Sequence, residues 1–259
     1  MGVKDDERRF AVQRRSRLAT ADVSVVVTAV NETFSLRQTV DILVDENPHD
    51  LAEIIVAIAP RTTAECRAVI AELQNEHPQL VWVHTQRKPF IGGAIQEAFE
   101  RACGAYVVMM ASDLETDPHA VRDLVREIRE SGADVVTASR WARGGKFVGY
   151  GRTKLAFNWT FQTLMRLVFL TRLSDMSYGY RIFRAEVLSE IRWEELKHPF
   201  LMETIIKPLR LGRRIREIPV AWSPRSEGES QMTLSAYWGY FRQALKTRFR
   251  PRRAVRRAA

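Results

Sequence analysis

The sequence predicts an α/β protein with a mostly parallel central sheet flanked by helices. Short runs of apolar, β-branched residues recur between residues 22 and 138, and segments with helical spacing of apolar positions separate them. The runs are almost continuously apolar rather than alternating, which is typical of parallel strands covered on both faces. In such sheets, ligands bind outside the carboxyl ends of the strands.

Five strands and the helices between them are expected in this part of the chain. The strands span residues 22–30, 53–58, 80–84, 106–110 and 134–138. The helices span residues 33–44, 62–77 and 92–103, and another begins at Pro118. Thr62 or Thr63 is a suitable N-cap, and proline suits a first helical turn, where its missing N–H costs nothing.

The pattern changes after Arg140. We expect a loop at 143–146, a largely apolar helix at 154–173, a loop and short strand at 175–183, a helix at 201–211, a strand at 214–222, a polar loop at 223–231 and a basic, aromatic helix at 234–249. The apolar helix is too short and too interrupted to span a bilayer. For its stripe from Phe157 to Phe169, core packing is favoured over lipid contact.

The net charge of +9 belongs to the two ends of the chain. Residues 242–259 contain eight basic residues and no acidic one, and residues 1–20 contain six basic and three acidic residues. This leaves 26 basic and 28 acidic residues between them. Such ends favour contact with an anionic membrane surface, and a merely solvated tail is the alternative. No nucleic-acid partner is expected, because only the ends would support one.

The sequence also predicts where the protein is found. The N-terminus lacks the apolar core of a signal peptide, and no apolar run approaches the roughly 20 residues that a membrane span needs. The two cysteines form no CxxC pair, which favours reduced thiols. We therefore expect a cytoplasmic protein, peripheral on the cytoplasmic face of the membrane, with its oligomeric state left open.

Two carboxylates directly after a buried strand are candidate metal ligands. Asp113 and Glu115 stand at i and i+2, and in extended geometry both side chains would lie on one side. Oxygen ligands suit Mg²⁺ or Mn²⁺, which would keep open positions for a diphosphate. The alternative is a loop acid and a charge at a helix N-terminus. His84, His119 and His198 lack metal-ligand spacing, so surface or supporting roles are favoured.

Basic residues follow the fifth strand at the same edge of the sheet. Arg140 follows that strand, and Arg143 and Lys146 flank two glycines whose backbone could approach a phosphate. Ordinary surface charge is the alternative. Further along, residues 224–230 form a loop with Arg225 among acidic residues, which taken alone would be a solvated loop.

The order of these pieces resembles family 2 glycosyltransferases of GT-A fold, most closely the dolichol- and polyprenyl-phosphate mannose or glucose synthases. The resemblance covers about residues 23–232, and the order of the motifs is more specific than any one of them. It is carried by Asn31-Glu32, Gly92-Gly93-Ala94, residues 106–118, residues 138–145, residues 175–183 and residues 218–230.

The resemblance implies a hexosyltransferase that moves a sugar, with inversion, from a nucleotide-diphosphate donor to a polyprenyl-phosphate acceptor. Asp113, Arg140 and Arg225 would be catalytic, and Asp113 and Glu115 would bind the metal. The nucleotide-sugar site would comprise Asn31, Glu32, Gly92, Gly93, Ser112 and Asp113. The acceptor phosphate would meet Arg140, Arg143, Lys146, Glu203, Arg225 and Ser230. Residues 21–232 would form the catalytic domain, between a basic tail at 1–20 and a basic helix and tail at 233–259.

The chain departs from the family pattern at several positions. Ala111 replaces the first acid of the strand-end motif, and Glu115 replaces a glutamine. Ile58 and Ala59 stand where an acidic pair usually contacts the base, and Gln231 replaces a lysine. Two alternatives follow: a transferase with a soluble acceptor, or a non-catalytic protein that binds a nucleotide sugar or a partner. A dinucleotide-dependent oxidoreductase is disfavoured, because no GxGxxG follows the first strand.

Overall fold

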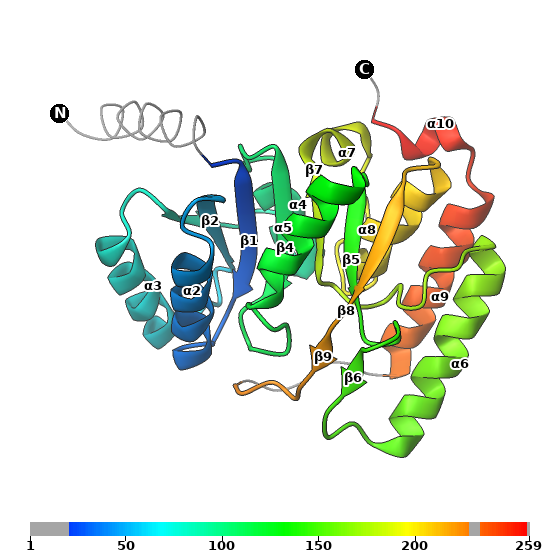
Figure 1. Cartoon of the computed structure of the whole chain (residues 1–259), viewed down its shortest axis with the longest axis horizontal. Helices are drawn as coiled ribbons and strands as arrows, with labels where there is room; N and C mark the ends of the chain where they lie inside the picture. The colour runs from blue at the N-terminus through cyan, green and yellow to red at the C-terminus, as the bar shows by residue number, and fades with distance from the viewer. Residues whose placement is uncertain (1–20, 228–233, 258–259) are drawn as a thin grey trace.

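A seven-stranded sheet lies at the centre of the protein, between layers of helices (Figure 1). The structure is a computed structural model that describes residues 21–227 and 234–257. In chain order the strands of this sheet are β1 (Val23–Ala29), β2 (Leu51–Ile58), β3 (Val81–Thr85), β4 (Tyr106–Ala111), β5 (Val135–Ser139), β7 (Arg181–Arg184) and β8 (Ile215–Pro219). In space their order is β3-β2-β1-β4-β7-β5-β8, and only β7 is antiparallel to its neighbours β4 and β5.

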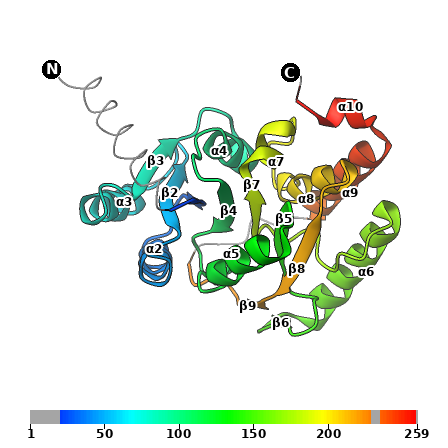
Figure 2. The same cartoon turned by 45° about the horizontal axis from the view of Figure 1, so that its top comes forward.

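The helices cover both faces of this sheet. The longer ones are α2 (Phe34–Glu46), α3 (Ala64–Glu76), α4 (Phe90–Phe99), α5 (Ala120–Ser131), α6 (Arg152–Phe169), α8 (Phe200–Arg210) and α9 (Leu234–Phe249). The short helices are α7 (Ala185–Glu190) and α10 (Arg252–Val255). A second, two-stranded parallel sheet pairs β6 (Lys146–Phe147) with β9 (Ala221–Trp222) beside the carboxyl ends of the main strands (Figure 2).

Alternate residues of the central strands pack into two separate hydrophobic clusters. In β1, Val25 and Val27 belong to the cluster built with α2, α3 and α5, whereas Val26 belongs to the cluster built with α4, α7, α8 and α9. Both faces of the sheet are therefore dry, which explains why the strands are apolar at nearly every position. The carboxyl ends of β1 and β4 lie next to each other, because Thr28 pairs with Ala111.

The predicted α/β architecture is confirmed. All five strands expected before Arg140 are present, and the helix boundaries differ from the expected ones by a few residues. Thr63 is the N-cap of α3, since its hydroxyl accepts a hydrogen bond from the Cys66 amide at 3.2 Å. Strand β7 inserts antiparallel between β4 and β5, and its direction could not be deduced from four residues of sequence.

The expectation of core packing for the aromatic stripe of α6 holds for Phe161 and Phe169, which pack against the core, but it is wrong for the outer face of the helix. Phe157, Trp159 and Leu167 are each more than half exposed. The buried positions of this helix include the polar residues Asn158 and Gln162. Within the described ranges, no helix is both long enough and apolar enough to cross a membrane.

Candidate active site

The turn after β4 holds the two carboxylates that the sequence singled out. Asp113 is 6% exposed, and its Oδ1 accepts a hydrogen bond from the Glu115 amide at 3.0 Å. Leu114 between them has a φ of 61°, in the left-handed region. The expectation of extended geometry is therefore wrong, because a tight turn bends the chain here. Both side chains nevertheless face one common group.

That common group is the guanidinium of Arg225, from the segment that follows β9. Its Nη2 lies 3.0 Å from Glu115 Oε2, and its Nη1 lies 3.6 Å from Asp113 Oδ2. The other oxygen of Glu115 accepts a hydrogen bond from the Trp222 indole at 3.1 Å. The structure thus brings Asp113, Glu115 and Arg225 together, as the sequence predicted.

The carboxylate pair is a site of concentrated negative charge. Burial, followed by the neighbouring Glu115 charge, raises the pKa of Asp113 to about 6. His198, just before α8, is close enough for the charges of this site to affect its pKa. Its pKa is lowered first by burial and then by the Arg225 charge. A buried carboxylate with a raised pKa is stabilised by a nearby cation, whether a side chain or a metal ion.

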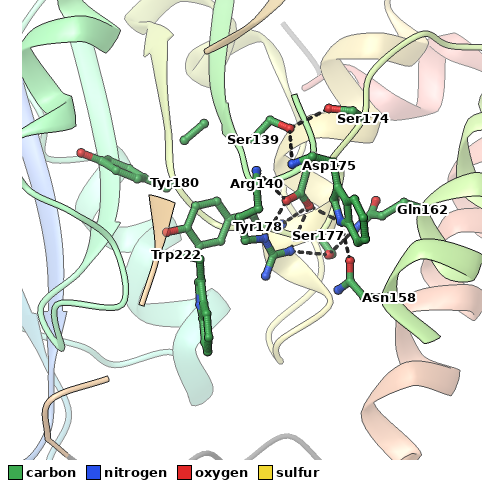
Figure 3. Close-up of polar contacts among 12 residues, drawn as sticks. Ser139, Arg140, Asn158, Gln162, Ser174, Asp175, Ser177, Tyr178, Tyr180 and Trp222 are labelled. Carbon is green, nitrogen blue, oxygen red and sulfur yellow. Dashed lines mark hydrogen bonds and ion pairs between the residues drawn. The ribbon is translucent and has the colours of Figure 1, made fainter. Parts of the chain in front are cut away.

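Arg140 lies in a buried polar network beside this turn, shown in Figure 3. Its Nε and Nη2 donate to the two oxygens of Asp175 at 2.7 and 3.0 Å. Asp175 also accepts from the Gln162 amide of α6 at 3.1 Å. Burial works against the guanidinium charge, but the Asp175 carboxylate outweighs it and raises the pKa of Arg140. Arg140, which the sequence predicts to contact a phosphate, is therefore bonded to the buried carboxylate of Asp175.

Tyr178 links this network to the carboxylate turn. Its ring lies under the Arg140 guanidinium, 4.6 Å from centroid to Cζ, in a cation–π contact. Its hydroxyl donates to the Glu115 carbonyl at 2.8 Å. Arg140 also stacks on Phe147 of β6 at 5.3 Å. These contacts place Arg140 next to the turn, although its polar bonds point to Asp175 and Ser177.

Arg143 is exposed on the loop that leads into β6, and Lys146 is the exposed first residue of that strand. The β6–β9 pairing carries this loop next to the segment of Arg225, since the Val148 amide donates to the Trp222 carbonyl at 2.8 Å. Backbone conformation and close packing account for the two glycines between Arg143 and Lys146. Gly144 has a φ of 103°, and a Cβ on Gly145 would lie 2.5 Å from the Arg140 carbonyl. The two cations remain candidates for phosphate contact.

Residues after β1 lie near the same edge of the sheet. The Glu32 carboxylate bonds back to the amides of Val30 and Asn31, at 2.7 and 3.1 Å, and Asn31 is exposed. Ser112 is buried, and its hydroxyl donates to the Thr28 carbonyl at 2.7 Å. These hydroxyl and carboxyl groups have internal partners, and the nucleotide contacts of Asn31, Glu32 and Ser112 stay predictions.

Gly92 and Gly93 serve close packing of α4. A Cβ on Gly92 would lie 2.5 Å from the Glu195 carbonyl oxygen, and one on Gly93 would lie 2.6 Å from that of Lys88. The Gly92 amide donates to the Leu196 carbonyl at 2.7 Å. The structure therefore explains both glycines without a ligand, and their contact with a nucleotide stays a prediction.

Glu203 lies inside the protein. It is fully buried on α8, where it forms an ion pair with Lys207 at 2.7 Å. It also accepts from the Glu195 amide at 3.0 Å and from Gln243 of α9 at 3.0 Å. These internal partners account for its charge, so it is not a helix surface charge, and its contact with an acceptor stays a prediction. Ser230 and Gln231 lie outside the described residues.

Apolar residues fill the place of the family's acidic pair after the second strand. Ile58 and Ala59 are buried, and the Ala59 amide donates a hydrogen bond to the Thr62 hydroxyl oxygen at 3.0 Å. Sequence reasoning missed Trp222, Tyr178 and Asp175 as individual residues, although the last two lie in a stretch that it quoted.

Comparison with known proteins now decides the family. The sequence profile described as glycosyl transferase family 2 matches residues 24–192, more than half of the chain. The chain belongs to glycosyl transferase family 2. Its α/β architecture is the GT-A fold of that family.

Curated relatives of this family member match most of the chain. Glycosyltransferase AglD of Haloferax volcanii is 30% identical over 224 residues, which cover 83% of this chain but only 36% of AglD. The undecaprenyl-phosphate mannosyltransferase of Micrococcus luteus is 28% identical, covering 82% of this chain and 87% of that protein. The dolichol-phosphate mannosyltransferase of Pyrococcus furiosus is 25% identical, with 85% and 62% covered.

Solved structures share the fold. Glucosyl-3-phosphoglycerate synthase from Mycobacterium tuberculosis, in complex with phosphoglyceric acid, is 19% identical with a TM-score of 0.68, covering 92% of this chain and 84% of that one. The same enzyme with Mn²⁺, uridine-diphosphate-glucose and phosphoglyceric acid has a TM-score of 0.67 and 18% identity, covering 92% of this chain and 83% of that one.

Asp175→Asn should destabilise the protein by about 3 kcal/mol, because the buried Arg140 guanidinium would lose its compensating charge. Urea denaturation would measure the change. Arg140→Met/Asp175→Asn should lose less than the sum of the two single variants, since the substitutions act on one contact. Strict additivity would contradict this account of the network.

Gly92→Ala should cost about 1–3 kcal/mol of stability, because its Cβ would overlap the carbonyl groups of Glu195 and Leu196. Gly151→Ala is the matched control, since a Cβ there meets nothing within 4 Å. Thermal or urea unfolding of both variants measures the difference. Equal stabilities would mean that the segment at 195–196 yields without cost.

Proposed function

We propose that this protein transfers a sugar, with inversion, from a nucleotide-diphosphate donor to a polyprenyl-phosphate acceptor, with Mg²⁺ or Mn²⁺ as cofactor. The observation that carries the proposal is the carboxylate pair Asp113 and Glu115, joined by Arg225 where β4 leaves the sheet. Family membership supports the reaction class. The names of the Micrococcus luteus and Pyrococcus furiosus relatives support the acceptor class.

The residues present fit a divalent cation. Asp113 and Glu115 offer carboxylate oxygens, the donor type that Mg²⁺ and Mn²⁺ prefer, and both face the same cation, Arg225. When bound there, the ion would offset the charge that develops on the diphosphate leaving group. The loss of an acid at Ala111 leaves two side-chain ligands, so donor phosphates would complete the coordination.

The protein's own cations would orient the two phosphates. Arg225 contacts the carboxylate turn, Arg143 lies on the loop before β6, and Lys146 is the first residue of β6. A phosphate oxygen of the acceptor would attack the anomeric carbon while the bond to the diphosphate breaks on the opposite face. Because a phosphate arrives as an anion, positioning and charge stabilisation suffice and no strong base is needed.

The membrane contact that we propose lies on α6 and α9, two neighbouring helices on one flank of the molecule (Figure 1). Neither helix contains an acidic residue, and both expose large apolar side chains together with Arg and Lys. The most exposed apolar side chains are Phe157, Trp159, Leu167, Leu170, Trp238 and Phe249. Apolar insertion combined with attraction to anionic lipid is how interfacial helices bind the cytoplasmic leaflet.

Part of the positive charge of the basic C-terminal segment is paired with acidic residues of the protein, so less of it is available to a membrane. Arg250 is paired with Glu194, and Arg256 lies 3.2 Å from Glu190, so these cations dock the segment on the body. Arg242 and Lys246 on α9 stay exposed. A lipid role for residues 1–20, and the division into tail, catalytic domain and C-terminal helix, stay proposals.

A soluble phosphorylated acceptor is the second candidate. The exposed cations Arg143 and Lys146 would bind a phosphate whether or not it carries a lipid. Activity with 3-phosphoglycerate that equals activity with polyprenyl phosphate, in the absence of detergent or vesicles, would favour it. Absence of nucleotide-sugar binding with Mn²⁺ would instead favour a non-catalytic binding protein.

Asp113→Asn should lower the release of nucleoside diphosphate by about 100-fold or more, because a charged group at the reacting phosphates is lost. The assay combines candidate nucleotide sugars, Mn²⁺ and polyprenyl phosphate in vesicles. Asp123→Asn, a half-exposed acid on α5, is the control that should retain wild-type turnover. Full activity of Asp113→Asn would refute the metal assignment.

Phe157→Ser/Leu167→Ser should reduce binding to anionic vesicles by at least about tenfold, because two exposed apolar side chains no longer insert. Co-sedimentation with phosphatidylglycerol-containing vesicles measures it. Phe90→Ser removes a similarly exposed aromatic ring from α4 and should leave binding unchanged. Equal losses in both variants would place the contact elsewhere.

A further inference from the structure

The segment that carries Arg225 is fastened at a second place, by Glu227. The Glu227 carboxylate accepts four hydrogen bonds from the start of α2. The Thr33 amide and hydroxyl lie 2.8 and 2.6 Å from it, and the Ser35 amide and hydroxyl lie 2.9 and 2.6 Å from it. Burial alone would raise the pKa of Glu227, but these bonds outweigh it and lower the pKa to about 2.

This contact supplies what the helix terminus lacks. Thr33 is the N-cap of α2, yet its own side chain caps no amide of the helix, and the first turn contains no acidic residue. The Glu227 carboxylate, 192 residues away from Ser35 in sequence, satisfies these amides instead. A carboxylate at this end is also favoured by the helix dipole.

Between the two side chains, the backbone is tied to the carboxylate turn. The Ser226 amide donates to the Asp113 carbonyl at 3.0 Å. Three consecutive residues therefore each contact a different part of the protein. Arg225 forms ion pairs with the Asp113 and Glu115 carboxylates, the Ser226 amide bonds the turn between them, and Glu227 bonds the start of α2. The position of the guanidinium and the capping of α2 are parts of one arrangement.

We propose that Glu227 is a positioning residue that holds Arg225 on Asp113 and Glu115, so that a divalent cation must displace Arg225 to bind. This inference rests on the metal site of the proposed function. Glu227 would thereby set how tightly the metal binds, although it does not contact the metal ligands itself.

The physical reason is competition for the same oxygens. Glu115 Oε2 and Asp113 Oδ2 face the guanidinium at 3.0 and 3.6 Å, distances that leave no room for an ion between them. A divalent ion on these oxygens would repel a guanidinium held nearby. Each hydrogen bond that keeps Glu227 on α2 therefore favours the metal-free arrangement. Release of Glu227 would also free Arg225 to meet a phosphate.

The test measures Mn²⁺ binding by electron paramagnetic resonance of the free ion, with the full chain and without substrates. Glu227→Gln should tighten Mn²⁺ binding by about tenfold, the change that about 1.4 kcal/mol produces. Ser35→Ala removes one bond from the other side and should tighten it by about threefold. Glu227→Gln/Ser35→Ala should show less than the product of the two effects.

Glu97→Gln is the matched control. Glu97 likewise accepts backbone bonds, from Lys88 and Arg87, and its pKa is also about 2, since these bonds and His84 outweigh the opposing effect of burial. It makes no contact with Arg225 among the described residues, so its loss should leave Mn²⁺ binding unchanged. A merely structural role for Glu227 would weaken or preserve binding in Glu227→Gln, whereas displacement of Arg225 predicts tighter binding.

The outcomes separate this inference from the proposed function. Unchanged or weaker Mn²⁺ binding in Glu227→Gln, with binding still abolished in Asp113→Asn, would overturn the positioning role and leave the metal site intact. Mn²⁺ binding that Asp113→Asn does not alter would overturn the metal site and the positioning role together. Release of nucleoside diphosphate by the wild type tests the transferase reaction independently of both.

Discussion

The negative charge of Asp113 and Glu115, held together where β4 leaves the sheet, is the constraint on which the rest of the site depends. A nearly buried carboxylate beside a second one is costly unless a cation faces both. In this structure Arg225 faces both. That requirement explains why a segment more than 100 residues later in the chain folds back across the ends of β1 and β4.

A two-stranded pairing and single hydrogen bonds, rather than a large interface, hold the Arg225 segment beside the two carboxylates. The β6–β9 pairing brings the chain back beside the loop after β5, and Trp222 then bonds Glu115 from its side. Tyr178 holds the carbonyl of the same turn while its ring supports Arg140. The charge of the turn and the position of Arg140 are therefore coupled through one aromatic ring.

Much of this could be predicted from the sequence, because the strongest signals are local. A buried strand and the acid that follows it can be recognised from a few neighbouring residues. The sequence therefore predicts β1 to β5 and the position of Asp113 just after β4. The direction of β7 and the left-handed Leu114 depend on packing that no short pattern encodes. Glu227 stands in a polar loop and Glu203 in a helical stretch, and neither local pattern indicates that the first caps α2 or that the second is covered by Gln243 of α9. Both roles depend on contacts between segments far apart in the sequence.

Helix α6 shows why periodicity could not decide between core and lipid contact. Its apolar residues occur all around the helix, so the sequence does not say which side faces inward. The structure turns Asn158 and Gln162 inward, where Gln162 bonds Asp175 and Asn158 bonds the Trp141 indole at 2.8 Å. The polar network around Arg140 thus occupies part of the inner face, Phe161 and Phe169 pack against the core, and Phe157 and Trp159 are left exposed. A helix whose inner face supports Arg140 and whose outer face is apolar and basic would suit the acceptor that we propose, which is half phosphate and half lipid.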